Sequence, residues 1–247
     1  MDFTISLLRG LGGVILLLGI AFLFSNNKKR INWRLVATGI GMQVIFAIFI
    51  LHSETLRSWF APLGWPKDAI NWMGTAIVSL LNFTMEGAQF VFGNLAKGTG
   101  PDSLGFFFAF QVLPTIIFVS CLTSLLYYLG ILQLIVKGMA WVMAKLLGTS
   151  GAESLSNTAN IFVGQTEAPL LIRPYIETMT KSELYTIMVG GMATIAGGVM
   201  ASYIQMLGQT YAEVMKIPVN EAQVKFAVQL LAASVMAAPA SLAISKV

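Results

Sequence analysis

The stretch NIFVGQTEAPLLIRP, residues 160–174, decides the fold of this chain. Its polar residues 165–167 lie between two apolar segments, 155–163 and 168–172. At about 1.5 Å per residue, a helix of roughly ten residues reaches only the middle of a bilayer core about 30 Å thick. The stretch therefore predicts a re-entrant hairpin that enters the membrane and returns to the same side.

Two residues of this stretch favour a sharp reversal of the chain. Gly164 permits a tight turn, and Pro169 suits the first turn of a returning half-helix, where no backbone donor is needed. The hairpin would hold the Glu167 carboxylate at membrane depth, where ionisable groups usually face a binding cavity. The alternative is a surface loop between two amphipathic helices, with Glu167 as a solvated charge.

The composition indicates a membrane protein. Of the 247 residues, 56% are hydrophobic and 11% are charged, whereas a soluble domain has about 25% charged residues. The net charge of +4 does not point to nucleic acid, because the basic residues form no stripe with interleaved aromatics. With Cys121 the only cysteine and His52 the only histidine, an intramolecular disulfide and a zinc cluster are excluded. Cys121 lies in an apolar run, which predicts a packed, inert thiol.

Five apolar runs predict membrane crossings: residues 5–25, 35–51, 106–129, 184–207 and 222–244. Basic residues follow the first run and place the next loop in the cytoplasm, with the N-terminus outside; they are Lys28, Lys29, Arg30 and Arg34. Because this cluster follows the apolar run rather than preceding it, the run is not expected to be a signal peptide. Pro114 predicts a kink in the third crossing.

Two further stretches predict helices that lie on the membrane surface. Residues 67–83 are flanked by tryptophans and fit the outer surface, with 86–95 as a continuation or a second short element. Residues 131–147 carry Lys137, Trp141 and Lys145 among apolar residues and fit the cytoplasmic surface. The fold class is therefore all-α and multi-pass, with about five transmembrane helices, two interfacial helices and one re-entrant hairpin.

The crossing at residues 184–207 is interrupted by Gly190, Gly191 and the sequence TIAGGV at 194–199. Each glycine lowers helix propensity by about 1 kcal/mol, so the glycines indicate either a break in the helix or close packing against a neighbour. The sequence favours neither of these two readings over the other. A broken helix beside a half-membrane hairpin is typical of one half of an inverted-repeat secondary transporter.

Two motifs resemble those of the concentrative nucleoside transporters. Residues 164–174 are followed at the right separation by MATIAGGV at 192–199, and residues 86–87, 90–93 and 110–114 look like further family signatures. The resemblance covers nearly the whole chain but only about the first three-fifths of a family member. It implies that the chain is a fragment, or that another polypeptide supplies the second half.

The resemblance also implies a site and a function. It implies a homotrimer in the cell (inner) membrane that imports nucleosides by symport with sodium. An amide and a carboxylate can bind a nucleobase edge, and oxygen ligands suit a hard cation. The resemblance places nucleobase contacts on Gln165, Thr166, Glu167 and Val199, and sodium ligands on Asn160, Val163, Thr194 and Ile195. Residues 1–147 would form a scaffold region, and 148–247 a transport region.

Other functions remain as alternatives. The symporter could be coupled to protons, or the chain could be a truncated membrane remnant that does not transport. A membrane enzyme is not favoured, because there is one histidine and no Gly-x-Ser-x-Gly motif to provide a nucleophile with its base. A channel is not favoured either, since a hairpin that stops inside the membrane suits an occluded site better than an open pore.

Overall fold

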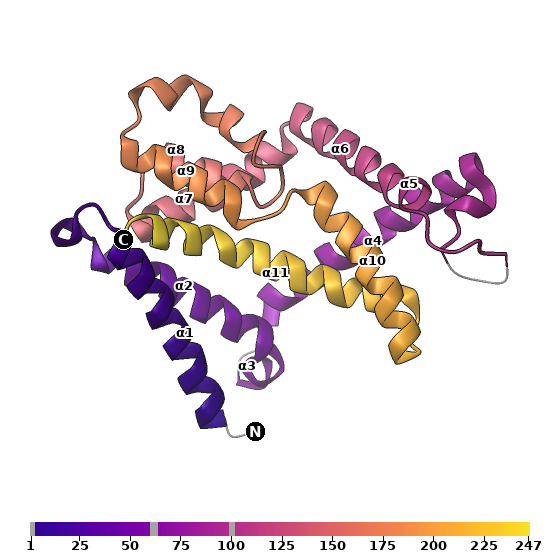
Figure 1. Ribbon diagram of the computed structural model, residues 1–247, viewed down its shortest axis with the longest axis horizontal. Helices are drawn as coiled ribbons and strands as arrows, with labels where there is room; N and C mark the ends of the chain where they lie inside the picture. Colours follow the sequence, from indigo (N-terminus) through magenta and orange to yellow (C-terminus); the bar gives the residue numbers. More distant parts are fainter. Residues whose placement is uncertain (1–2, 60–63, 99–101) are drawn as a thin grey trace.

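The computed structural model describes residues 3–59, 64–98 and 102–247, and over these ranges it contains helices and no strand. The N-terminal part comprises α1 (Phe3–Phe24), η1 (Lys28–Arg30), α2 (Trp33–Leu51), α3 (Ser53–Trp59) and α4 (Trp65–Phe92). Figure 1 shows these helices in indigo to magenta. The all-α expectation is confirmed.

Helix α4 is one continuous helix of 28 residues, so residues 86–92 continue the helix expected at 67–83 rather than forming a second element. By length and composition it could cross a membrane. With it, the described residues contain five such stretches: Trp33–Leu51, Trp65–Ala96, Phe108–Tyr128, Lys181–Met215 and Val219–Ser245. The number five agrees with the sequence, and the first expected crossing, residues 5–25, corresponds to the apolar helix α1, Phe3–Phe24. A surface position for α4 stays a prediction.

The middle of the chain comprises η3 (Gly93–Ala96), α5 (Phe108–Gln111), α6 (Leu113–Tyr128) and α7 (Ile131–Leu147). Pro114 lies in the first turn of α6, after an interruption at Val112 that separates α5 from α6 within the possible crossing Phe108–Tyr128. Proline is tolerated there because its missing N–H has no helical partner to lose.

Helix α7 has the bounds expected from the sequence. It begins after Gly130 and ends at Gly148, and both glycines adopt the left-handed conformation that suits a helix end. Its buried face recurs every three or four residues through Leu132, Val136, Ala140, Met143 and Leu147. Cys121 on α6 is exposed rather than packed, because few residues of α6 are covered by other helices.

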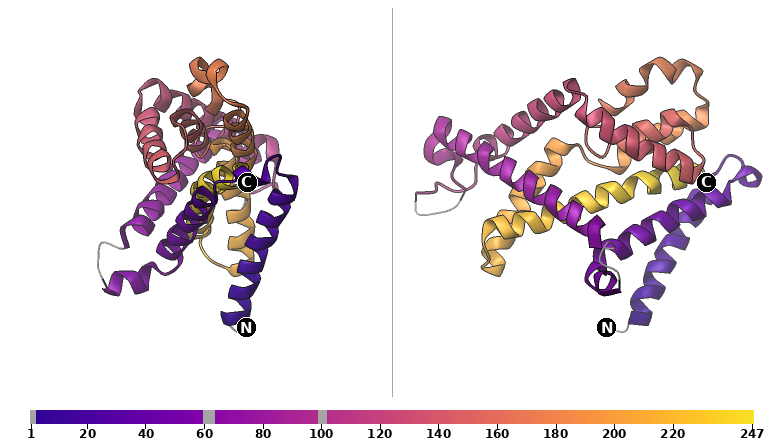
Figure 2. Two further views of the ribbon diagram at one scale, coloured as in Figure 1. Left: turned by 90° about the vertical axis from the view of Figure 1, so that its left-hand side faces the viewer. Right: turned by 180° about the vertical axis from the view of Figure 1, so that it is seen from behind.

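The C-terminal part comprises α8 (Gly151–Ala159), η4 (Ala168–Thr178), α9 (Lys181–Ala193), α10 (Gly197–Met215) and α11 (Val219–Ser245). Helix α11 runs through the middle of the molecule and packs against α2, α4, α9 and α10 (Figures 1 and 2). The largest core cluster joins α4, α10 and α11; its buried members are Ile70, Val78, Leu81, Met200, Ala201, Ile204, Ala227, Leu231 and Ala232.

Close approach of α2 and α11 depends on Gly39. A Cβ added to this glycine would lie 2.8 Å from Ala243 Cβ and 3.1 Å from the Pro239 carbonyl oxygen. Away from such contacts, many large apolar side chains are exposed, including Phe90 at 92% and Phe24 at 84%. Such apolar surface is what a helix needs against lipid or another subunit.

Candidate functional site

Two short helical arms and a turn form the region that the sequence predicts as a hairpin. The first arm, α8, has nine residues and starts with a capping box, in which the Ser150 N–H donates to Glu153 Oε1 at 2.8 Å and the Glu153 N–H donates to Ser150 Oγ at 3.4 Å. The turn spans residues 160–167, and the second arm, η4, packs against α8. The position of this hairpin region within a bilayer stays a prediction.

The returning arm differs from the half-helix expected at this position. Residues Ala168–Thr178 form a 3₁₀ helix of eleven residues, with Pro169 in its first turn and Pro174 inside it. Two prolines so close together remove backbone donors, and the ring of Pro174 would clash with the carbonyl four residues earlier in an α-helix. The arm is instead wound as a 3₁₀ helix, with three residues per turn.

The helix break, one of the two interpretations that the glycine pairs left open, is present. Helix α9 ends at Ala193 and α10 begins at Gly197, with Thr194 (φ −132°, ψ 168°) and Ala196 (φ −61°, ψ 148°) in extended conformation. Close packing is present as well, because a Cβ on Gly190 would collide with the side chain of Asn157. The two readings of the glycines therefore hold at different positions of the same helix.

Asn160 joins the turn to the break. Its Nδ2 donates to the Gly190 carbonyl oxygen at 2.7 Å and to Thr194 Oγ1 at 2.6 Å, and Thr194 Oγ1 donates to the Asn160 carbonyl oxygen at 3.0 Å. In an unbroken helix the Thr194 N–H would reach the Gly190 carbonyl. The break removes that donor, and the buried Asn160 amide replaces it.

The four residues assigned to sodium lie at this junction. In the described part of the chain, no donor forms a hydrogen bond to the backbone carbonyl of Val163, Thr194 or Ile195. The side chain of Val163 packs in a core cluster with Leu132 and Val136, so only its carbonyl could face an ion. These carbonyl oxygens, together with the side-chain oxygens of Asn160 and Thr194, are ligands of the kind that a hard monovalent cation prefers.

The residues assigned to the nucleobase lie at the tip of the turn, where the side chains of Gln165, Thr166 and Glu167 are all exposed. Val199, in the first turn of α10, is 41% exposed. The backbones of tip and break approach closely: a Cβ added to Gly197 would lie 2.7 Å from the Phe162 carbonyl oxygen. Among the described residues, no hydrogen bond joins Val199 to the three tip residues.

Sequence reasoning missed Asn157 as a member of this region. Its Nδ2 donates to the Glu153 carbonyl oxygen, its Oδ1 accepts from Ser241 Oγ at 2.9 Å, and its side chain fills the space left by Gly190. In the sequence, the run SLSNTAN at 154–160 indicates a polar helix surface at this position, because small polar residues at adjacent positions are unusual in a chain this apolar.

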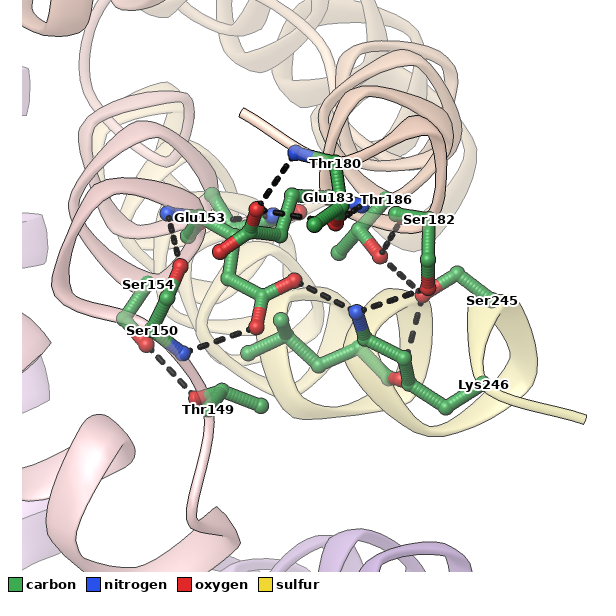
Figure 3. A network of polar contacts seen from close by, with 12 residues as sticks. Thr149, Ser150, Glu153, Ser154, Thr180, Ser182, Glu183, Thr186, Ser245 and Lys246 are labelled. Carbon is green, nitrogen blue, oxygen red and sulfur yellow. Dashed lines mark hydrogen bonds and ion pairs between the residues drawn. The ribbon is translucent and has the colours of Figure 1, made fainter. Parts of the chain in front are cut away.

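A polar network at the other end of α8 fixes the starts of α8 and α9 to the end of α11 (Figure 3). Lys246 Nζ lies 2.7 Å from Glu153 Oε2 and donates to Ser182 Oγ at 3.1 Å. Ser245 Oγ donates to Thr186 Oγ1 at 3.0 Å. Helix α9 starts with its own capping box, Thr180 with Glu183. Both boxes carry the Ser/Thr-x-x-Glu pattern, which is a sequence signature of a helix start.

Two protein families match this chain. Residues 12–95 match the family described as Na+ dependent nucleoside transporter N-terminus. Residues 109–210 match the family described as nucleoside recognition, named Gate, and this second match includes the hairpin region and the broken helix.

Curated relatives match almost the entire chain. An uncharacterized transporter of Haemophilus influenzae is 45% identical over 98% of this chain and 51% of its own length. Sodium/nucleoside cotransporter 1 of Rattus norvegicus is 41% identical over 95% of this chain and 31% of its own length. Solute carrier family 28 member 3 of Homo sapiens is 40% identical over 95% of this chain and 29% of its own length.

Solved structures show the same fold. CNTnw in an inward-facing substrate-bound state has a TM-score of 0.79 and 39% identity, over 97% of this chain and 52% of CNTnw. A variant of CNTnw in an outward-facing state has a TM-score of 0.79 and 38% identity. The chain spans about half the length of these structures and at most about half that of the curated relatives, which is less than the three-fifths expected.

Proposed function

Because this chain belongs to the concentrative nucleoside transporter family, we propose that it forms the base-facing and ion-facing half of a secondary active transporter that imports nucleosides by symport with sodium. Both matching families name nucleoside in their descriptions, and one of them, like several relatives, also names sodium. The membership supports transport rather than enzymatic catalysis.

The observation that carries the proposal is the junction of the hairpin turn with the helix break. Asn160 bridges the two elements through the Gly190 carbonyl and the Thr194 hydroxyl. The carbonyls of Val163, Thr194 and Ile195, which accept no hydrogen bond within the described residues, are proposed as further ligands. A sodium ion held there would stabilise carbonyl groups that the break leaves without helical donors.

The nucleobase is proposed to bind beside this junction. Gln165 offers both a donor and an acceptor to a base edge, and the Glu167 carboxylate accepts from ring or exocyclic N–H groups. Both side chains are exposed at the tip with Thr166, so they are available to a ligand. Val199 would provide an apolar contact to the base from the start of α10.

The remaining parts of the proposal concern the whole transporter. We place it in the cell membrane as a homotrimer, with the N-terminus outside, residues 1–147 as a scaffold region and 148–247 as a transport region. Residues outside this chain would supply the contacts to the ribose. Proton coupling and a non-transporting remnant are the competing functions.

Uptake of radiolabelled uridine tests the proposal in cells that lack their own nucleoside transporters. The cells express this chain alone, CNTnw, or this chain joined to the part of CNTnw that it does not cover. We expect sodium-dependent uptake from the joined protein. Uptake that follows a proton gradient and ignores sodium would favour the proton-coupled alternative. A joined protein that inserts but does not transport, beside an active CNTnw, would favour the remnant.

A further inference from the structure

Asn157 and Asn160 lie one turn apart at the end of α8, and both contact Gly190 of α9. Asn160 Nδ2 donates to the Gly190 carbonyl oxygen at 2.7 Å. Asn157 covers the α-carbon of the same glycine, because a Cβ added there would collide with Asn157 Oδ1. The two asparagines are 2% and 3% exposed, so the contacts that enclose them come from this chain itself.

The Gly190 carbonyl decides which way the Asn160 amide points. A carbonyl oxygen can only accept a hydrogen bond, so the atom that faces it must be the amide nitrogen. The same nitrogen donates to Thr194 Oγ1 at 2.6 Å, and both N–H groups of the amide are then used. Asn160 Oδ1 accepts no hydrogen bond within the described residues, so it is the atom left for an ion.

Ser241 of α11 holds the Asn157 side chain in place. Ser241 Oγ donates to Asn157 Oδ1 at 2.9 Å, and Asn157 Nδ2 donates to the Glu153 carbonyl oxygen at 2.9 Å. Ser241 is buried. The same turn of α11 is packed closely on α2, where a Cβ on Gly39 would lie 3.1 Å from the Pro239 carbonyl oxygen. The contact with α2 therefore helps to fix the position from which Ser241 donates.

We propose that Asn157 and Ser241 are positioning residues of the sodium site, an inference that rests on the proposed function. Ser241 orients Asn157, and Asn157 holds the backbone of Gly190 against α8. The Gly190 carbonyl in turn keeps Asn160 Oδ1 directed toward the ion. Both polar atoms of the Asn157 side chain are used within the protein, so Asn157 acts through Asn160 and is not itself a ligand. Residues that orient a ligand typically change metal affinity by about 10–100-fold when they are lost.

Thermal unfolding of the purified chain in detergent measures sodium binding without transport, because an ion that binds the folded state raises the melting temperature. Sodium chloride is varied against choline chloride at constant ionic strength. Ser241→Ala removes only a hydroxyl group. We expect it to raise, by about 10-fold, the sodium concentration needed for a given increase in melting temperature. Asn157→Ala should raise that concentration at least as much.

The matched control is Thr115→Val, which also removes a buried hydroxyl group that donates to a side chain, here Gln205 Oε1 at 2.9 Å. It should lower the melting temperature without changing the sodium concentration required. Adding Ser241→Ala to Asn157→Ala should cause no further increase in that concentration, because Ser241 acts through Asn157.

Three results would overturn the inference and leave the proposed function in place. An unchanged sodium requirement in Ser241→Ala would make the role of Ser241 only structural. An equal increase in Thr115→Val would mean that any loosening of the fold weakens sodium binding. Additive effects in the double variant would show that Ser241 does not act through Asn157. A failure of the proposed sodium site is distinguishable, because the melting temperature of the unaltered chain would then not respond to sodium, and the inference would fall with it.

Discussion

Asn160 and Glu167 illustrate two different roles for polar residues within one turn. Asn160 is 3% exposed, and its amide donates hydrogen bonds to the Gly190 carbonyl and the Thr194 hydroxyl. Its side chain therefore contributes to the stability of the fold. Glu167 is exposed at the tip, and the fold makes little use of its charge. Substitutions at the two positions should therefore separate stability from transport.

Replacing Asn160 by alanine should lower both stability and sodium dependence. The buried Gly190 carbonyl would lose its donor, at a cost of about 1–3 kcal/mol. Thermal unfolding of the purified chain in detergent measures the first effect, and the sodium response of uptake by the joined protein measures the second. Asn94→Ala, at an exposed position, is the control and should change neither. An Asn160→Ala variant with an unaltered sodium response would reject the ion assignment.

Glu167→Gln should abolish most uridine uptake and leave the melting temperature unchanged. The substitution keeps the size of the side chain but replaces a carboxylate that accepts from base N–H groups by an amide that also donates. Uptake by the joined protein and thermal unfolding are measured in parallel. Normal uptake by a protein carrying this substitution would remove Glu167 from the site.

At the scale of elements, α8 and α9 fit together through a pairing of asparagine with glycine. The side chain of Asn157 fills the position that a Cβ of Gly190 would need. One residue later, a Cβ on Gly191 would lie 3.4 Å from Gln165 Cβ, which is an ordinary contact. Adjacent glycines in the same helix therefore have different tolerances for a side chain.

Gly190→Ala should destabilise the chain by about 1–3 kcal/mol, because the added methyl group forces Asn157 out of its packed position. Gly191→Ala is the matched control and should be neutral or slightly stabilising, since alanine favours a helix more than glycine does. Both are measured by thermal unfolding. Equal effects of the two substitutions would mean that helix propensity, and not packing, sets the response.

At the scale of the whole molecule, the Glu153–Lys246 ion pair fixes the last turn of α11 to the start of α8. The side chains of Lys246 and Glu153 are 16% and 4% exposed, whereas the Lys67–Glu54 pair lies at the surface with 29% and 78% exposed. Only the first pair is protected enough from water for the loss of one partner to matter strongly.

Lys246→Gln should cost about 3–5 kcal/mol, because it leaves the buried Glu153 carboxylate without a counter-charge. Adding Glu153→Gln should recover part of that loss, since a neutral pair can share a hydrogen bond. Lys67→Gln serves as the surface control, with an expected loss of at most about 1 kcal/mol. A loss no larger than the control's would show that water screens the Glu153 pair as well. Thermal unfolding measures all the variants.

The sequence alone determined the features that depend on local composition. The turn at residues 160–167 and the bounds of α7 follow from residue type and spacing over a few turns. The glycines of 184–207 indicated either a break or close packing, and only the structure showed that both occur. The returning arm is a 3₁₀ helix rather than a half-helix, and Pro174 inside it disfavours an α-helix. The charges and tryptophans of 65–92 favour a surface helix, whereas the length of α4 also allows a crossing.

The tertiary structure decided which distant residues meet. Asn160 bonds to Gly190 thirty positions away, and Ser241 bonds to Asn157 across 84 positions. No periodicity in a sequence encodes such pairs, because they depend on how whole helices cross and on where small side chains allow close approach. Composition predicts a set of membrane helices, and their packing decides which polar groups of distant segments form hydrogen bonds and ion pairs.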